Sequence, residues 1–349
     1  MTMPVMKFSE AIRDAYLQTM RANSEVYLIG VGIIDPKAVF GSVEGLLKEF
    51  GEDRVVEGPL AEQMLTGFAF ASATLGMRPV LIHHRVDFLP LTMDQIVNHC
   101  AKWSYMFGGQ QTVPMVIRGI VGRGWGNGPQ HTQSLHGLMA NIPGLKVVVP
   151  SNAADAKGLM IAAILDNDPV IYIDHRWLHG DSCEVPEGLY QIQLGKANIL
   201  REGVDLTLVA IGPMVQEALI AAKQAAESGC SIEVIDLRTI RPLDFETIIA
   251  SVKKTGHLII ADSDWPHFGV ASALISQISQ KAFGALKKAP ISITWPDHPV
   301  PASYALDAKY YPMAKQITEA ISKLLSNILY ENISEQTSKS HAGVHAGPF

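Results

Sequence analysis

Short apolar runs alternate with longer segments of mixed polarity along most of the chain. Residues 26–30 (VYLIG) are such a run ending in glycine, the pattern of a buried parallel strand that opens onto a loop. Residues 61–75 lack strand alternation, contain many small side chains and stop at Gly76, which predicts a closely packed helix capped by glycine. Strands followed by helices of this length predict a mostly parallel sheet covered on both faces.

The same rhythm continues to residue 176 and then resumes after a break. Ser151 is expected to cap the helix that follows it. In the first part we expect helices at 1–23, 93–105, 133–139 and 153–165, and strands at 80–84, 113–117, 146–149 and 169–173. In the second part we expect strands at 206–211, 232–235, 258–261 and 291–295, and helices at 215–227, 245–252, from 270 onward and at 315–325.

These elements predict an α/β protein made of two three-layer domains, each with a parallel sheet. The first domain spans residues 1–176, and residues 177–201, rich in polar residues and turns, form a linker. The second domain spans residues 202–328, and residues 329–349 form a tail with few apolar anchors.

Composition narrows the class of protein. The chain has 349 residues, of which 48% are hydrophobic and 18% charged, so it can bury a large core and is not intrinsically disordered. A net charge of −6 without a cluster of Lys and Arg argues against nucleic acid as a partner. Three scattered cysteines form neither a disulfide framework nor a metal-ligand pair, and no apolar run approaches the ~18 residues of a membrane span, so we expect a cytoplasmic protein.

Polar side chains recur where strands of the first domain meet loops, the edge at which open α/β sheets bind ligands. For each, a plainer interpretation competes: a glutamate at a helix start is often only a favourable charge at the helix dipole, and histidines can end a strand in solvent. No phosphate-binding loop, dinucleotide fingerprint, zinc-protease motif or nucleophile elbow occurs. The polar residues are Glu62, His83, His84, Arg85, Asp87, Arg118, Arg123, His131 and His136.

Three long collinear segments resemble the β subunit of the thiamine-diphosphate-dependent E1 component of 2-oxo acid dehydrogenase complexes. They are residues 58–80 (GPLAEQMLTGFAFASATLGMRPV), 87–119 and 129–171, and shorter similarities occur at 236–244 (DLRTIRPLD) and 297–301 (DHPVP). The resemblance extends to about residue 325. It implies a pyrimidine-binding domain followed by a transketolase C-terminal-like domain.

The resemblance also implies roles for single residues. It places the Glu62 carboxylate against the aminopyrimidine ring of thiamine diphosphate, where it promotes proton transfer, with Phe88 stacked on the ring and Leu60 lining it. His131 matches the family's active-site histidine, which binds the substrate carboxylate or assists acyl transfer. From the residues alone, Leu60 and Phe88 would be core and His131 a hydrogen-bonding loop residue.

Further ligands and partners are implied in the same way. A potassium ion would bind main-chain carbonyls, where the plainer interpretation is a helix end meeting a loop. No GDG motif occurs, so Mg²⁺ and the diphosphate would be held by an α subunit in an α2β2 heterotetramer with a β–β contact, and a lipoyl E2 acyltransferase would accept the acyl group. The potassium ligands would be Met115, Ala163, Ile164, Asp166 and Asp168.

The chain also departs from this family. Members commonly carry GEDV or GEEV after the first strand, with acids associated with a channel between paired active sites; here residues 30–33 read GVGI. Residues 262–267 (DSDWPH) and Trp295-Pro296 also differ from the usual residues.

Three functions remain open on the sequence. The first is an E1 β subunit, acting on a 2-oxo acid such as pyruvate. The second is a split transketolase or another two-carbon transferase, and the third is a non-catalytic paralogue that stabilises an α-type partner. The substrate pocket would be shared with another chain, so the sequence leaves the 2-oxo acid open.

Overall fold

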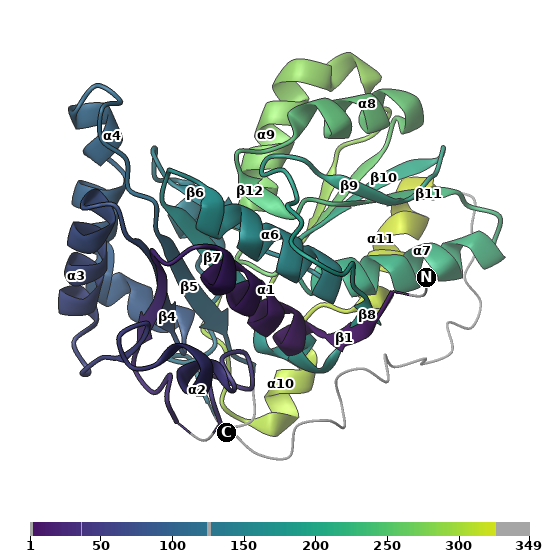
Figure 1. The fold of residues 1–349 in the computed structure, drawn as a ribbon. Helices are drawn as coiled ribbons and strands as arrows, with labels where there is room; N and C mark the ends of the chain where they lie inside the picture. The colour runs from purple at the N-terminus through teal and green to yellow at the C-terminus, as the bar shows by residue number, and fades with distance from the viewer. Residues whose placement is uncertain (1–2, 36, 124–126, 326–349) are drawn as a thin grey trace. The chain divides into compact units, whose positions relative to one another are not determined.

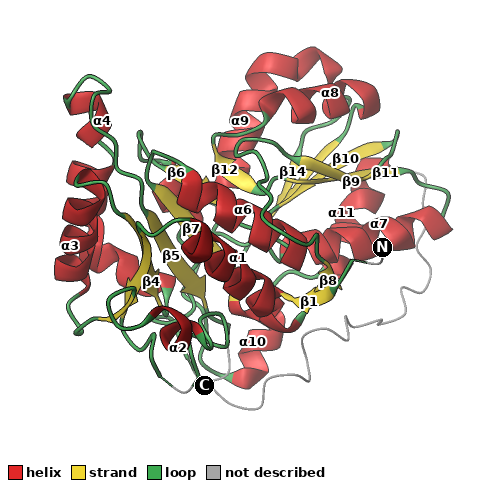
Figure 2. Ribbon diagram, viewed as in Figure 1, coloured by secondary structure: helices red, strands yellow, loops and turns green. Residues whose placement is uncertain are grey.

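A computed structural model of the chain describes residues 3–35, 37–123 and 127–325. The chain forms two compact units (Figure 1). The first comprises Met1–Arg123, Gln130–Leu135 and Met139–Leu194, and the second comprises Gly124–Pro129, His136–Leu138 and Gly195–Phe349. In each unit helices flank a sheet, as the red and yellow elements of Figure 2 show, so the predicted α/β class is confirmed.

The sheet of the first unit is parallel because helical connections return the chain to the same end of each strand. The strand order is β6-β7-β5-β4-β2-β3. The strands are β2 (Val26–Gly30), β3 (Val55–Glu57), β4 (Arg78–His83), β5 (Val116–Val121), β6 (Lys146–Val148) and β7 (Val170–His175). A separate antiparallel ribbon pairs β1 (Val5–Lys7) with β8 (Ser182–Glu184).

Helices cover both faces of this sheet. Helices α1 (Phe8–Ala22) and α6 (Ala153–Leu165) pack side by side and share a core with alternate residues of β2, β4, β5 and β7. Because successive strand side chains point to opposite faces, the remaining strand residues face the other way, where α3 (Glu62–Thr74) packs on β4. The shorter elements are α2 (Leu46–Phe50), η1 (Val86–Thr92), η2 (Gln95–Cys100), α4 (Trp103–Met106), α5 (His136–Ala140) and η3 (Arg176–Gly180).

The second unit has a five-stranded sheet in the order β14-β13-β10-β11-β9. Its apolar core lies against α7 (Met214–Glu227) and α11 (Ala314–Leu325), while α8 (Phe245–Thr255) packs on β10 and on α9 (Val270–Ala282). The strands are β9 (Asn198–Arg201), β10 (Leu206–Ala210), β11 (Ile232–Asp236), β13 (Leu258–Ala261) and β14 (Ile291–Ile293). The smaller elements are β12 (Thr239–Arg241), η4 (Phe283–Ala285) and α10 (Tyr304–Tyr310).

Several predicted boundaries were wrong. Asn152, not Ser151, caps α6, because its side-chain oxygen accepts the backbone N–H of Asp155 at 2.8 Å. The helix expected at 93–105 is divided into η2, which has π geometry, and the short α4. Strand β9, within the predicted linker, pairs antiparallel with β11, so the second sheet is not purely parallel.

Residues 177–194 belong to the first unit, where Tyr190, Ile192 and Leu194 pack against its core. Residues 329–349, predicted as a tail, lie outside the described residues. Within the described ranges, none of the helices is long and apolar enough to cross a membrane.

Candidate functional site

The carboxyl ends of β2 and β4 mark the point where the chain changes direction across the first sheet. From β2 the chain passes to β3 on one side, and β4 then lies on the opposite side of β2. In open α/β sheets, ligands bind beside such a switch point, outside the carboxyl ends of the strands. The loop after β2, the segment η1 after β4 and the start of α3 after β3 all leave the sheet at this edge.

Phe88 and His131 are brought together at this edge. Their ring centroids are 5.8 Å apart and their planes are nearly perpendicular, at 88°. Phe88 lies in η1, and both side chains are partly buried. An edge-to-face pair holds each ring in a fixed orientation while leaving part of it accessible.

Two contacts fix the loop that carries His131. Asp87 Oδ1 accepts hydrogen bonds from the backbone N–H of Gln133 at 3.1 Å and from its Nε2 at 2.9 Å. Burial raises the pKa of Asp87, and the hydrogen bonds from Gln133 oppose that shift. Gly122 passes so close to the carbonyl oxygen of His131 that a Cβ at residue 122 would collide with it. The sequence placed Asp87 at the strand edge but gave no signal for the roles of Gln133 and Gly122.

Glu62 is the first residue of α3, and its carboxylate makes no hydrogen bond or ion pair with any described residue. A negative charge is favourable at a helix N-terminus because the backbone N–H groups there have no helical partner. Leu60 is 83% exposed, so its side chain is not core. Helix α3 packs on η1, the element that carries Phe88.

The loop after β2 is organised by Glu57, at the end of β3. Its carboxylate accepts the backbone N–H groups of Gly32, Ile33 and Ile34 at 2.6, 3.0 and 3.3 Å. A carboxylate from the neighbouring strand therefore holds this loop in place.

A buried ion pair links β5 and β7 in the middle of the sheet. Arg118 donates two hydrogen bonds of 2.8 Å to Asp174, and both side chains are fully buried. Asp174 also lies 2.6 Å from His179 Nε2, and Arg118 reaches Ser42 at 2.7 Å. Burial alone would raise the pKa of Asp174, but the charge of Arg118 holds it well below its usual range. Arg118 is therefore bound in a structural ion pair.

The other polar residues predicted at the strand edge do not form one cluster. Burial, and then His84, lower the pKa of His83 to about 4, which keeps it neutral at physiological pH. His136 belongs to the second unit, where it contacts Asp262 and Asp264. Across the described ranges, no three His, Cys, Asp or Glu side chains are grouped so that they could hold a metal ion.

The carbonyl groups expected to bind potassium lie at the C-terminal end of α6 and beside it. Arg78 Nη1 donates to the carbonyl oxygens of Ile164 and Asp166, at 3.0 Å each, and the Met115 carbonyl accepts Val170 N–H at 3.0 Å. The carbonyls of Ile164 and Asp166 therefore point toward one place. Each carbonyl oxygen has a second lone pair, so these bonds leave acceptor capacity for a cation.

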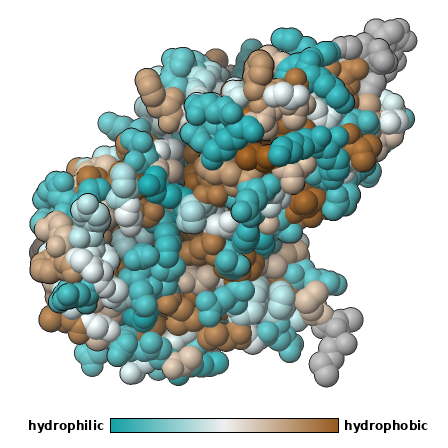
Figure 3. Space-filling view, turned by 90° about the horizontal axis from the view of Figure 1, so that it is seen from above, coloured by the Kyte–Doolittle hydropathy of each residue, from teal (hydrophilic) through white to brown (hydrophobic). Residues whose placement is uncertain are grey.

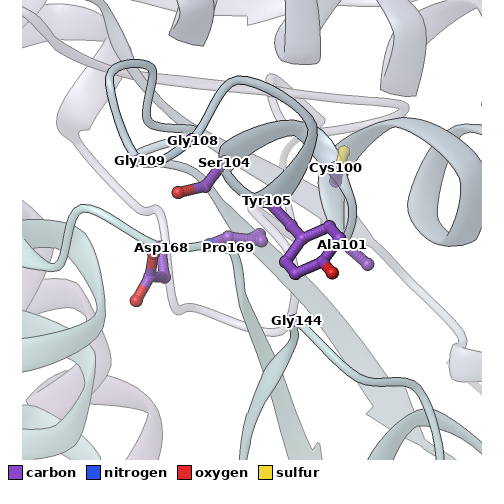
Figure 4. A pocket seen from close by; sticks show the side chains of 9 residues that line it. All are labelled: Cys100, Ala101, Ser104, Tyr105, Gly108, Gly109, Gly144, Asp168 and Pro169. Atoms are coloured by element: carbon purple, nitrogen blue, oxygen red, sulfur yellow. The ribbon is translucent and has the colours of Figure 1, made fainter.

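The carboxylates of this segment are paired with Lys146. Its ammonium group lies 2.7 Å from Asp166 and 3.0 Å from Asp168. Asp168 also lines an open cavity of about 440 Å³ whose other walls include Ser104 and Tyr105 (Figure 4). This cavity brings together few polar groups besides the paired Asp168.

An apolar face is exposed on α3. Met64 and Phe68, one helical turn apart, are 54% and 57% exposed, and Leu75, the residue that follows the helix, is 85% exposed. Apolar patches, brown in Figure 3, are visible among hydrophilic residues on the face shown there. Large apolar side chains gathered on one exposed helix face mark protein–protein contacts.

The sequence model described as "Transketolase, pyrimidine binding domain" matches residues 5–179, and that described as "Transketolase, C-terminal domain" matches residues 195–317. A solved structure of a split-gene transketolase, an inactive β4 tetramer, has the same fold, with a TM-score of 0.74 at 24% identity over 92% of this chain and 98% of that one. The chain is thus a two-domain protein of the transketolase-like, thiamine-diphosphate class.

Closer relatives define the family. The acetoin:2,6-dichlorophenolindophenol oxidoreductase β subunit of Cupriavidus necator is 43% identical over 326 residues, covering 90% of this chain and 96% of that protein. The pyruvate dehydrogenase E1 β subunit of Bacillus subtilis is 40% identical over 324 residues, covering 93% and 99%. The chain belongs to the family of E1 β subunits of pyruvate and acetoin dehydrogenases, and the predicted family and order of domains are confirmed.

Proposed function

We propose that this chain is the β subunit of a two-chain enzyme that decarboxylates a 2-oxo acid such as pyruvate and transfers the acyl group to lipoamide on an E2 protein. The observation that carries the proposal is the Phe88–His131 pair at the edge of a sheet that matches the pyrimidine-binding domain. Thiamine diphosphate, when bound, would supply the carbanion chemistry. The three free cysteines suit a reducing, cytoplasmic compartment.

The side chains at this edge fit such a cofactor. The Glu62 carboxylate has no partner among the described residues and can accept a hydrogen bond from a ring nitrogen. Leu60 is exposed and Phe88 partly so, and both can contact an aromatic ring. His131, oriented by Phe88, can bind a substrate carboxylate or hold a proton during acyl transfer.

An α subunit would complete the site. The described residues contain no cluster for Mg²⁺, so the metal and the diphosphate would be held by that partner. The exposed Met64, Phe68 and Leu75 fit a buried contact with another chain, as in an α2β2 assembly with a β–β contact. We further propose a potassium ion at the carbonyls of Met115, Ala163, Ile164, Asp166 and Asp168, supported by the closeness of the Ile164 and Asp166 oxygens, each of which keeps a second lone pair.

Acetoin is a second candidate substrate. It is favoured by the identities of 43% and 42% to two acetoin:2,6-dichlorophenolindophenol oxidoreductase β subunits, against 40% for the pyruvate dehydrogenase E1 β subunit of Bacillus subtilis. The difference is small, so the assay must include both substrates.

The test uses this chain purified together with its α-type partner. Thiamine-diphosphate-dependent reduction of 2,6-dichlorophenolindophenol and release of CO2 are measured with 2-oxo acids and with acetoin. CO2 release from a 2-oxo acid, with NAD⁺ reduction once E2 and E3 are added, supports the first proposal; dye reduction with acetoin alone supports the second. Activity with ketose phosphates only, or a stable complex inactive on every substrate, would show that both are wrong.

A further inference from the structure

Phe40, in the loop after β2, is surrounded by side chains that can carry positive charge. The guanidinium carbons of Arg85 and Arg176 lie 5.3 and 4.6 Å from the centre of its ring. The rings of His84 and His179 lie 5.9 and 6.1 Å from it. Arg85 follows β4 and Arg176 follows β7, so Phe40 brings together guanidinium groups from the carboxyl ends of two strands.

The carboxylates of Asp87 and Asp174 act electrostatically on Arg85 and Arg176, respectively, but neither lies close enough to form an ion pair. Arg85 is 9% exposed and Arg176 partly buried, yet neither forms an ion pair with a described carboxylate. The nearby carboxylate of Asp174 is already bonded to Arg118 and His179. Buried arginines are normally paired, because removing a charge from water without compensation is costly.

Hydrogen-bond donors at the same place are also unused. Arg85 donates one bond, from Nη1 to the carbonyl oxygen of His84 at 3.0 Å, and its buried Nε has no acceptor. Buried His84 Nε2 likewise has no partner, and Arg176 makes no hydrogen bond to a described residue. Most buried polar groups are satisfied, so several unsatisfied nitrogens around one ring point to an absent acceptor.

The backbone that presents Phe40 is strained. Ala38, Val39 and Phe40 have φ values of 43°, 49° and 58°, in the left-handed region that costs energy for residues other than glycine. Such strain persists where the surroundings hold a side chain in a required position, and it concentrates at binding and catalytic sites. Here it places the Phe40 ring against both guanidinium groups.

We propose that Arg85 and Arg176, held against Phe40 at the β2/β4 switch point, bind the carboxylate or phosphate group of a small molecule. Guanidinium groups match both oxyanions in charge and geometry, and each can donate two parallel hydrogen bonds to them. The ring of Phe40 limits the approach of water to both cations. This binding is a property of the chain that can be measured without turnover, so it stands or fails independently of the reaction proposed above.

The test measures anion binding to the full-length chain purified with its partner, at low ionic strength where charge interactions are weakly screened. Potassium phosphate and sodium pyruvate are titrated separately by calorimetry into the wild type and into Arg85→Gln and Arg176→Gln. Arg13→Gln is the matched control, since Arg13 is in the same unit and its side chain, 38% exposed, makes among the described residues only a 3.7 Å contact with Glu44. We expect each site variant to weaken binding at least tenfold and the control to leave it unchanged.

The two probes distinguish the source of the oxyanion. Tight binding of phosphate but not pyruvate indicates a phosphorylated ligand, and tight binding of pyruvate but not phosphate indicates a carboxylic acid. Thermal unfolding without ligand gives a second readout. Because the two cations repel each other, Arg176→Gln should unfold at no lower a temperature than wild type, whereas a merely structural arginine would lower it. The proposal is overturned if neither phosphate nor pyruvate binds, or if the probe that binds has equal affinity for wild type and both site variants.

Discussion

His136 Nε2 lies 2.8 Å from Asp262 Oδ1 in the second unit, and both side chains are completely buried. Burial alone would lower the pKa of His136, but Asp262 and then Asp264 outweigh it and raise the pKa from 6.5 to about 9. His136 is therefore a buried imidazolium at neutral pH, held by two carboxylates.

Because of this pair, we expect the free energy of unfolding to decrease as the pH rises from about 6.5 to about 9. A histidine whose pKa is higher in the folded than in the unfolded state contributes its full stabilisation below the unfolded value and loses it as the pH rises through the folded value. The loss is on the order of 2 to 3 kcal/mol, measured as the free energy of unfolding in urea at a series of pH values. In the double variant His136→Gln/Asp262→Asn, which keeps a hydrogen bond without either charge, this interval should be flat; an equal slope in both proteins would refute the assignment.

Gly122→Ala tests how the loop of His131 is held. The new Cβ would collide with the His131 carbonyl oxygen, so the loop must move and the Phe88–His131 contact must change. We expect turnover to fall at least ~10-fold and the free energy of unfolding to fall by about 1–3 kcal/mol, as for other overpacked sites. Gly284→Ala is the control, because a Cβ there meets no atom within 4 Å. Unchanged kcat in Gly122→Ala would mean that the position of His131 does not matter for the reaction.

The sequence located the regular elements well where their pattern is local. The 153–165 helix and the 258–261 strand have the predicted bounds, since each is rich in apolar residues and lies between clear end signals. Strand β5 was placed too early because Arg118 interrupts its apolar run. Arg118 is buried there only because Asp174, on β7, pairs with it, and a contact so distant in sequence leaves no local signal.

In the candidate site, too, single residues could be predicted from the sequence, but contacts between distant segments could not. Family resemblance supplied Glu62, Phe88 and His131 as single residues, and the contact between Phe88 and His131 appeared only in the fold. Asp87, Gln133 and Gly122 act by holding a loop, which depends on hydrogen bonds and close approaches between separate segments. The Arg85–Phe40–Arg176 cluster likewise joins three segments and has no sequence motif.

Glu62→Gln should remove turnover while leaving the fold intact. The substitution keeps the size of the side chain but removes a group that can exchange a proton, a change worth about 10²–10⁴-fold in rate. Because the Glu62 carboxylate has no described partner, we expect the unfolding temperature and assembly with the α-type partner to be unchanged. The matched control is Glu52→Gln, at an exposed position. If Glu62→Gln turned over substrate as wild type does, its proposed role would be wrong.

Phe68→Asp should prevent assembly. Phe68 is 57% exposed in the middle of the apolar face of α3, so a charge there would be buried without a partner in a complex. The isolated chain should lose no more than about 0.5 kcal/mol of stability, as is usual for exposed positions. Size-exclusion chromatography of the co-expressed chains measures the effect. Leu189→Asp, at a 46% exposed residue, is the control, and a normal complex formed by Phe68→Asp would place the interface elsewhere.

Potassium should stabilise the chain more than sodium does at equal ionic strength. The carbonyl oxygens of Ile164 and Asp166 converge on Arg78 Nη1, and a cation that uses their second lone pairs would tie α6 to the segment before β7. A ligand present at 100 times its dissociation constant adds about 2.7 kcal/mol to the free energy of unfolding, which is enough to shift the unfolding temperature measurably. General screening of the Lys146 ion pairs with Asp166 and Asp168 affects both salts equally, so only a bound ion separates them. Identical unfolding temperatures in the two salts would show that Arg78 alone satisfies these carbonyls.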